Sequence, residues 1–391
     1  MKAFSAHAAP LARQTWRFGA LSLAALAALW LASCTSPGPK PPTELPPETE
    51  PAPESAVAGT LQRPKSQWVP TSFSELPGWG QDDLSQWWPA LRQSCNRPAA
   101  GWQRACAQVQ NVLDVEPASA KLWLENTFQV YRLQTPQGEN IGLMTGYYEP
   151  SMRAVRQSTA QHKTPLHQPP SDLATRQPYW TRQQLDTLPA AQAALKGREI
   201  AWLDDPLDVL VLQIQGSGRL TVREPDGREQ LVRVSYVAHN GHPYRSVGRW
   251  LIDQGALKPS EASWQGIKDW AKRNPKRVKE MLWQNPRVVF FNETPLTNPD
   301  EGPRGAQAVP LTPARSIAVD PGSVPYGTPI WIDSTDPKTN QPLQRLVMAQ
   351  DTGGAITGAV RADYFWGWTG EAEAQAGRTR QPLRMWALWP K

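Results

Sequence analysis

Short strand-like segments, each followed by an aspartate, fill the C-terminal part of the chain and restrict it to a β-rich fold. Three of them share an apolar or alternating pattern: residues 315–319 precede Asp320, residues 346–350 precede Asp351, and residues 358–362 precede Asp363. Short runs of this kind, bounded by glycine and proline, are typical of β-strands that end in turns. We therefore expect the three aspartates at strand ends or in turns.

Further patterns divide the rest of the chain into strands and helices. Strands are expected at 207–214, 220–223, 230–237, 288–291, 328–332, 345–349 and 384–388, with a hairpin turn at 224–227. Helices are expected between 84 and 131, where Trp123, Phe128 and Tyr131 recur at near-helical spacing, and at 246–253 and 260–283. These patterns predict a mainly β protein with peripheral helices.

The N-terminus has the pattern of an export signal. Two arginines precede an apolar run at 18–31, which is too short to cross a bilayer as a helix. Residues 31–34, Leu-Ala-Ser-Cys, resemble the lipobox of bacterial lipoproteins, in which the cysteine is lipidated. The resemblance implies a lipid anchor on Cys34. The next residue, Thr35, resembles the sorting signal that directs such lipoproteins to the outer membrane, where they face the periplasm. The alternative is an ordinary signal peptide with an unrelated cysteine.

The segment after the export signal is expected to be a tether. Residues 37–64 are rich in Pro, Glu, Ser and Thr, so they cannot bury enough apolar surface to fold. With Cys34 lipidated, Cys95 and Cys106 are the remaining cysteines. An exported protein reaches a compartment that permits disulfides, so we predict a bond between them that closes a small loop between two helical segments.

Several other classes of function have little support. The formal net charge is +6, but no basic run with interleaved aromatics predicts nucleic-acid binding. His239 and His242 form an HxxH in a turn without an acidic partner at helical spacing, so no metal site follows. Ser217 lies between two glycines without the spacing of a nucleophile elbow. No cofactor is expected. The 19 tryptophans suit either sugar-stacking platforms or ordinary core packing.

The three aspartates are candidates for acid–base chemistry. Gly353 and Gly354 follow Asp351, and glycines let a backbone or a ligand approach closely. Asp363 precedes Tyr-Phe-Trp, an apolar setting that raises a carboxyl pKa towards that of a general acid. The alternative is that each aspartate only stabilises a turn. Three acids in one short stretch favour a site.

The same residues resemble a known family of bacterial cell-wall enzymes. Residues 318–320, 351–356 and 361–365 are similar to the domain named for its three aspartates. Upstream, three motifs complete the pattern of the membrane-bound lytic transglycosylase A family: Gly-Tyr-Tyr-Glu-Pro at 146–150, Gln-Ile-Gln-Gly-Ser-Gly at 213–218, and Asn-Pro-Arg-Val-Val-Phe-Phe at 285–291. Two residues depart from it, since we expect Ser and Tyr where Arg287 and Val288 stand.

The resemblance implies an activity and a set of site residues. A lytic transglycosylase cleaves the β-1,4 bond between N-acetylmuramic acid and N-acetylglucosamine, and the muramyl 6-hydroxyl attacks to give a 1,6-anhydro end. The resemblance implies that Asp363 is the catalytic acid, supported by Asp320 and Asp351. The expected substrate-binding residues are Tyr147, Tyr148, Gln213, Gln215, Ser217, Gly353 and Gly354. Packing at strand ends is the alternative for their side chains.

The fold implied is a double-psi β-barrel with an inserted β domain and a groove between them. The expected segments are a signal peptide at 1–33, a tether at 34–64, an N-terminal helical part at 65–145, an inserted β-rich domain at 146–285, and the C-terminal barrel part at 286–391. Expected partners are peptidoglycan strands, the outer membrane, and proteins of cell-wall synthesis or hydrolysis. The alternative functions are a glycan hydrolase on the same barrel and a non-catalytic peptidoglycan-binding lipoprotein.

Overall fold

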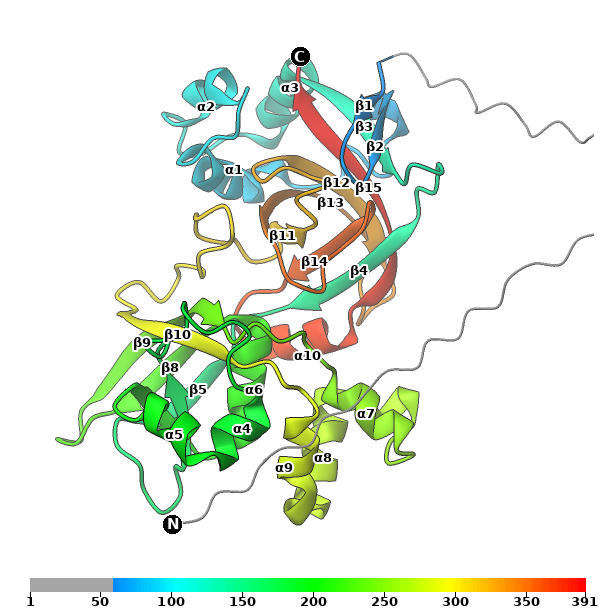
Figure 1. Cartoon of the computed structure of the whole chain (residues 1–391). Helices are drawn as coiled ribbons and strands as arrows, with labels where there is room; N and C mark the ends of the chain where they lie inside the picture. Colours follow the sequence, from blue (N-terminus) through cyan, green and yellow to red (C-terminus); the bar gives the residue numbers. More distant parts are fainter. Residues whose placement is uncertain (1–58) are drawn as a thin grey trace, which may run out of the picture. The chain divides into compact units, whose positions relative to one another are not determined.

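Two β-sheets organise the residues that the computed structural model describes, 59–391 (Figure 1). The export signal, Cys34 and most of the Pro-rich segment lie outside these residues. The tether was expected to extend to Pro64, yet Leu61–Gln62 already forms the edge strand β1 and pairs with β2. Leu61 lies opposite Trp68, so an apolar contact recruits this end of the segment into the sheet.

The larger sheet has nine strands and closes into a barrel. Its order is β1-β2-β3-β15-β12-β13-β11-β14-β4, and β4 pairs with β15 as well as with β14, which joins the last six strands into a ring. The strands are β1 Leu61–Gln62, β2 Gln67–Thr71, β3 Phe128–Gln134, β4 Gly142–Tyr147, β11 Ser316–Val319, β12 Pro329–Thr335, β13 Pro342–Asp351, β14 Arg361–Phe365 and β15 Arg380–Pro390. The expected fold class, mainly β with a barrel, a second β domain and peripheral helices, is confirmed.

Alternating side chains give the barrel strands two apolar faces. In β12, Ile330 and Ile332 pack into the barrel core with Val347 and Ala349 of β13. Trp331, between the two isoleucines, points to the opposite face and joins a second cluster beneath the N-terminal helices. A strand covered on both faces has no solvent side, which explains the nearly continuous apolar runs in this part of the sequence.

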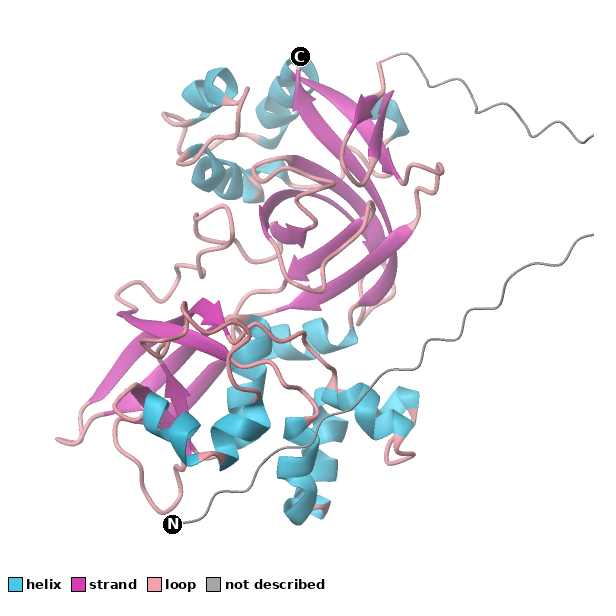
Figure 2. Ribbon diagram, viewed as in Figure 1, coloured by secondary structure: helices cyan, strands magenta, loops and turns pink. Residues whose placement is uncertain are grey.

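The N-terminal helices cover the outer face of the barrel sheet (Figure 2). They are α1 Trp88–Cys95, α2 Gln103–Val109 and α3 Pro117–Thr127, with 3₁₀ turns η1 Phe73–Glu75 and η2 Leu84–Gln86. Phe128 and Tyr131, expected on a helix, lie on strand β3 instead. The helix before them ends at Thr127, because Phe128 adopts an extended backbone and pairs with Pro390 of β15.

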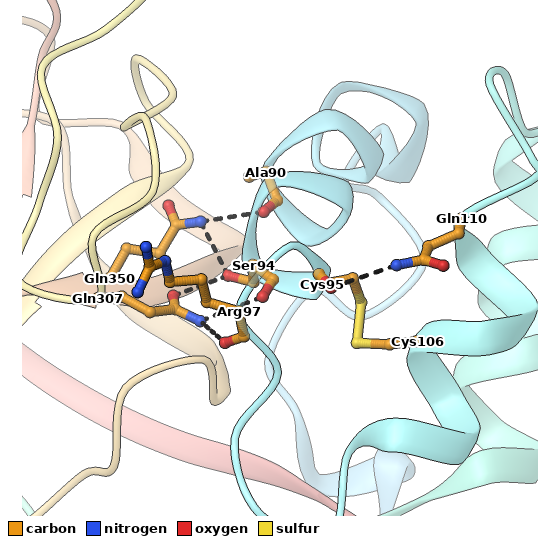
Figure 3. The surroundings of a disulfide bond; sticks show 8 residues. All are labelled: Ala90, Ser94, Cys95, Arg97, Cys106, Gln110, Gln307 and Gln350. Carbon is orange, nitrogen blue, oxygen red and sulfur yellow. Dashed lines mark hydrogen bonds between the residues drawn. A yellow bond between two sulfur atoms is a disulfide. The ribbon is translucent and has the colours of Figure 1, made fainter.

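A disulfide joins α1 to α2 and a polar network ties α1 to the barrel (Figure 3). Cys95 and Cys106 are bonded, with their Cα atoms 5.1 Å apart. Gln350 Nε2, on β13, donates to Ala90 O at 3.0 Å and to Ser94 Oγ at 2.8 Å. Ser94 Oγ donates in turn to Gln307 Oε1. These bonds satisfy buried polar groups where a helix meets a strand that carries a candidate site residue.

The second sheet has six strands in the order β10-β9-β8-β5-β7-β6. The strands are β5 Ser151–Val155, β6 Thr164–His167, β7 Glu199–Leu203, β8 Ser217–Arg223, β9 Glu229–His239 and β10 Val289–Pro295. The hairpin between β8 and β9 turns at 224–227 as expected, with Gly227 at a φ of +86°. Residues 207–214, expected as a strand, are part of helix α6, Pro206–Gln215.

Further helices pack around the second sheet and between the two sheets. They are α4 Arg182–Thr187, α5 Pro189–Leu195, α7 Val247–Asp253, α8 Trp264–Arg273, α9 Val278–Trp283 and α10 Gly370–Arg378, with η3 Pro259–Glu261 and η4 Pro275–Arg277. The helix expected at 246–253 is confirmed, with Ser246 as its N-cap. The one expected at 260–283 is broken after Arg273, because Pro275 cannot continue an α-helix.

A buried ion-pair cluster fastens the crossing between the sheets. Glu149 is fully buried just after β4, and it accepts hydrogen bonds from Arg219 Nε and Arg233 Nε, each at 2.7 Å. Both arginines also donate to the carbonyl oxygen of Glu301, on the chain that returns to the barrel. The segment that leaves the barrel and the segment that re-enters it are thus held by one carboxylate.

Candidate active site

Strand register places two of the three aspartates in one row. Ala318 of β11 lies opposite Asp351 of β13 on one side and opposite Asp363 of β14 on the other. Asp363 in turn lies opposite Thr145 of β4. Residues opposite one another share a face, and two strand spacings amount to about 10 Å. The residue that lies between the two acids, Ala318, has only a small side chain. Asp363 was expected at a strand end, but it lies in the middle of β14.

Asp363 is held by β4 and has an unusually high pKa. Its Oδ1 accepts a hydrogen bond from Thr145 Oγ1 at 2.5 Å, and Arg361 Nη2 donates to the same Thr145 oxygen at 2.9 Å. Burial raises the pKa of Asp363 to about 6, against the Thr145 hydrogen bond and the charge of Arg361, which lower it. The negative charge of Asp351 adds to the rise. A carboxyl group of this kind can give and take a proton near neutral pH.

Asp351 is fixed through both of its oxygens. Oδ2 accepts from Tyr147 Oη at 2.9 Å, and Oδ1 accepts from the backbone N–H of Ala306, also at 2.9 Å. Burial raises the pKa of Asp351, although its hydrogen bonds, including one from the Thr352 backbone, oppose the rise. The Tyr147 ring packs on Phe365 with centroids 5.1 Å apart. Tyr147 therefore links the row of acids to the far end of β14.

Asp320 lies in a different environment from Asp351 and Asp363, and its hydrogen bonds give it a structural role. Lys65 Nζ donates to its Oδ2 at 2.8 Å, and the backbone N–H groups of Gly322 and Gly358 donate to its two oxygens. Burial would raise the pKa of Asp320, but these hydrogen bonds and the charge of Lys65 outweigh it and lower the pKa. Gly358 stands shortly before β14, so the ionised Asp320 positions the strand that carries Asp363.

The expected groove residues divide into packed and accessible ones. Tyr148 is only 6% exposed and packs against Val211 and Ala372 of two helices, so most of its surface is covered by the protein, and its part in binding substrate stays a prediction. Gln213 Oε1 accepts from Arg182 Nη2, and Gln215 Oε1 accepts from the backbone N–H of Tyr148. These two amides therefore hold helix α6 to its neighbours, because their acceptors are occupied within the protein.

The remaining candidates lie on accessible backbone. Ser217 is the first residue of β8 and is partly exposed. Gly353 is partly exposed and Gly354 is exposed, in the loop that follows Asp351. A Cβ at Gly353 would come within 3.1 Å of Ile356 Cγ1, closer than ordinary packing allows. A glycine at this position thus keeps the loop compact beside the row of acids.

Thr145 and Lys65 bond to the aspartates, and Arg361 acts on Asp363 through its charge, but none of these three residues was predicted from the sequence. Thr145 lies 218 positions from Asp363, and Lys65 lies 255 positions from Asp320. The only local signal was that Arg361 and Asp363 alternate on one strand, which places them on one face.

Neither a metal centre nor a membrane span is found in the described part of the chain. Residues 59–391 contain no group of three or more His, Cys, Asp or Glu side chains arranged to hold a metal ion. Within the same range, no helix has both the length and the apolar character needed to cross a bilayer.

Comparisons with known proteins agree with the barrel and the second sheet. The sequence profile described as "MltA specific insert domain" matches residues 143–292, and the profile described as "3D domain" matches residues 315–389. Membrane-bound lytic murein transglycosylase A of Escherichia coli (strain K12) is 32% identical over 252 residues. That alignment covers 62% of this chain and 64% of the E. coli protein, so less than two thirds of this relative is matched.

Solved structures are similar over most of their length. The lytic transglycosylase LtgG of Burkholderia pseudomallei is 44% identical, with a TM-score of 0.60, and the match covers 86% of this chain and 98% of that one. MltA from Neisseria gonorrhoeae is 31% identical, with a TM-score of 0.72, and the match covers 85% and 95%. The chain therefore belongs to the membrane-bound lytic murein transglycosylase A family.

Proposed function

We propose that this protein is a lytic transglycosylase of peptidoglycan. Its substrate is the β-1,4 bond between N-acetylmuramic acid and N-acetylglucosamine, and its product is a 1,6-anhydromuramic acid end. The observation that carries the proposal is the Asp363 carboxyl, whose pKa is raised to about 6 in a row with Asp351 and Thr145. Membership of the family, whose named relatives are lytic murein transglycosylases, supports the same reaction.

One carboxyl group suffices for this chemistry. Asp363, protonated, donates its proton to the leaving O4 of N-acetylglucosamine while the bond from that oxygen to the muramyl C1 breaks. The resulting carboxylate then takes the proton of the muramyl 6-hydroxyl, whose oxygen forms the new bond to C1. Asp363 regains its proton and no water is consumed. Thr145 and Arg361 hold the carboxyl in place, and Asp351 favours its protonated form.

A hydrolase on the same barrel is the second candidate, because two carboxyl groups stand in one row. An inverting hydrolase needs its second carboxylate free to take a proton from water. Asp351 accepts from Tyr147 through one oxygen and from the Ala306 backbone through the other. These bonds fit a positioning group better than a water-activating base. A non-catalytic binder is disfavoured because holding a glycan does not require an acid with a raised pKa.

The protonation state of Asp363 predicts how the rate depends on pH. The group must be protonated to donate to the leaving oxygen, so kcat/KM should be level below pH about 6 and fall about tenfold per pH unit above it. The measurement is the initial rate of murein solubilisation from about pH 4 to about pH 8 at constant ionic strength. A rate that instead rises through this range would assign Asp363 a role that needs its carboxylate form.

We place the protein at the periplasmic face of the outer membrane, anchored through Cys34. A Cys34→Ala variant should lose its acyl chains and leave the membrane fraction, since each buried CH₂ contributes about 0.8 kcal/mol to anchoring. Fractionation of cells and the mass of the N-terminal peptide measure this. An unchanged fractionation, together with a parent protein that carries no acyl mass, would contradict the anchor.

The products of a murein digest test the proposed function. Purified protein is incubated with intact sacculi, and the soluble fragments are separated and their molecular masses are measured. Anhydro-muropeptides, one water lighter than hydrolysis products and resistant to borohydride reduction, are the expected result. Reducing ends would establish the hydrolase, and binding to sacculi without release would establish the non-catalytic lipoprotein.

A further inference from the structure

The segment just before β10 is held rigidly and carries an arginine towards the acid row. Asn240 Nδ2 donates to Pro286 O at 2.8 Å, and Asn285 Oδ1 accepts from the Arg287 backbone N–H at 3.2 Å. Arg182 donates to the carbonyl oxygen of Arg287 itself. Asn240 and Asn285 are both buried, so the backbone of Arg287 is fixed by the core of the second domain.

The guanidinium of Arg287 reaches the loop that follows Asp351. Its Nη1 lies 3.8 Å from the position that a Cβ of Gly354 would occupy. Gly354 is exposed, and because it has no side chain, nothing at that position covers the guanidinium. Arg287 therefore extends from the second domain to a loop of the barrel. That loop begins at Asp351, three residues before Gly354.

Arg287 is a cation without a counter-charge in the described part of the chain. No ion pair and no hydrogen bond from its guanidinium is found among residues 59–391, whereas the buried Arg219, Arg233 and Arg315 are each paired with a carboxylate. The guanidinium does act on its surroundings: the pKa of His239 is lowered by burial and then by the charge of Arg287. Arg287 is partly exposed, and a planar guanidinium that has no partner of its own suits bidentate binding of a carboxylate.

The neighbouring surface fits a sugar. Tyr236 is 48% exposed on β9, and its ring lies 6.5 Å from that of His239, centroid to centroid. Exposed aromatic rings of this kind pack on the apolar faces of sugars while their hydroxyls stay in water. The exposed ring of Tyr236 and the unpaired guanidinium of Arg287 thus lie at the same end of the second sheet. The side chain of Arg287 extends from this end to the barrel loop.

We propose that Arg287 binds a carboxylate of the murein strand and so selects charged muramyl units over neutral glycan. This inference rests on the proposed function, because it takes the strand as the substrate. The carboxylate has two sources: the lactyl group of a muramic acid without a peptide, or the peptide stem of a substituted one. Both present the same planar anion to the guanidinium.

The test compares three substrates and three variants of the full chain. The substrates are strands with stems, strands whose stems have been removed at the lactyl amide, and those same bare strands with their carboxylates converted to methylamides. The variants are Arg287→Gln, Arg287→Lys, and Arg153→Gln as a control.

The control residue, Arg153, is an exposed arginine on β5, where it pairs with Glu229 at 3.3 Å. KM and kcat are measured for each, with thermal melting to verify folding.

Arg287→Gln is expected to raise KM about tenfold on a carboxylate-bearing strand with kcat within about twofold, and to leave the methylamide strand unaffected. Arg287→Lys should recover part of the loss, and Arg153→Gln should match the parent. A rise only on bare strands identifies the lactyl carboxylate, and a rise only on substituted strands identifies the stem.

An unchanged KM on both charged substrates, or an equal rise on the methylamide strand, would overturn the proposal. If the parent protein cleaves no strand, the proposed function fails separately, and calorimetric binding of the same three strands still decides the role of Arg287. Loss of affinity confined to the charged strands would uphold the carboxylate site, and equal affinity of Arg287→Gln and parent for them would refute it.

Discussion

Asp363→Asn is expected to lower turnover on murein by at least ~10²-fold while binding to insoluble murein is retained. Asparagine keeps the size of the side chain and still accepts from Thr145 Oγ1, so the geometry of β14 is preserved. It cannot donate a proton to the leaving oxygen or take one from the 6-hydroxyl. The measurements are murein release and sedimentation with sacculi, on the same purified preparation.

The stability of this variant separates a chemical effect from unfolding. The folded pKa of Asp363, about 6, lies above its ordinary value of 3.8, so the folded state binds the proton more tightly than the unfolded chain. The contribution of this group to stability is therefore present at low pH and is lost as the pH rises through about 6. Asparagine removes the unfavourable ionised form, so Asp363→Asn should be at least as stable as the parent at neutral pH.

The other two aspartates are the matched comparison. Asp351→Asn should reduce activity less, because it weakens the support given to Asp363 without removing the proton donor. Asp320→Asn should act mainly through stability, since it breaks the ion pair with Lys65. An active Asp363→Asn beside an inactive Asp351→Asn would move the acid to Asp351. Full activity in all three variants would make the row of acids structural.

Glu149→Ala is expected to destabilise the protein by about 3–5 kcal/mol, because it leaves two buried guanidinium groups without their carboxylate. The side chains of Arg219 and Arg233 are only 6% and 8% exposed, so both charges lie away from bulk water. Arg219 is further confined by the Trp368 ring, 3.9 Å from its guanidinium carbon. Urea unfolding followed by tryptophan fluorescence measures the loss.

Glu229→Ala is the control for this prediction. Glu229 pairs with Arg153 at 3.3 Å on the surface, where both side chains are largely exposed. An exposed pair contributes at most about 1 kcal/mol, so this variant should unfold close to the parent. If Glu149→Ala unfolds at the same urea concentration as Glu229→Ala, the ion-pair cluster does not stabilise the crossing between the sheets.

The strands of the barrel could be predicted because their signals are local. The segments that became β11, β12, β13 and β15 are short apolar or alternating runs between glycine, proline and aspartate, and each appears where it was expected. Helix α6 was missed because an apolar run of eight residues fits either a buried strand or a buried helix. Its caps carried the missing information: Asp205 accepts from the Leu207 N–H, Pro206 occupies the first turn, and Gly216 ends it at a φ of +80°.

Site residues could be predicted only where reactive side chains lie close to one another in the sequence. The three aspartates stood out because they fall within one short stretch and share a pattern with their glycines. The contacts that distinguish them come from distant segments, since β4 brings Thr145 to Asp363 and the chain before β2 brings Lys65 to Asp320. Arg287 was noticed as a departure from a motif, but its approach to Gly354 depends on how the second sheet meets the barrel.

A digest of murein in water enriched in ¹⁸O tests the account most directly, because it asks whether water enters the product. If Asp363 both gives and takes the proton and the muramyl 6-hydroxyl attacks C1, the released fragments carry no ¹⁸O at the cleaved bond. If an activated water attacks C1 instead, each cleavage adds one heavy oxygen to a reducing end. The account predicts fragments of unchanged isotopic mass, and incorporation of one ¹⁸O per cleaved bond would contradict it.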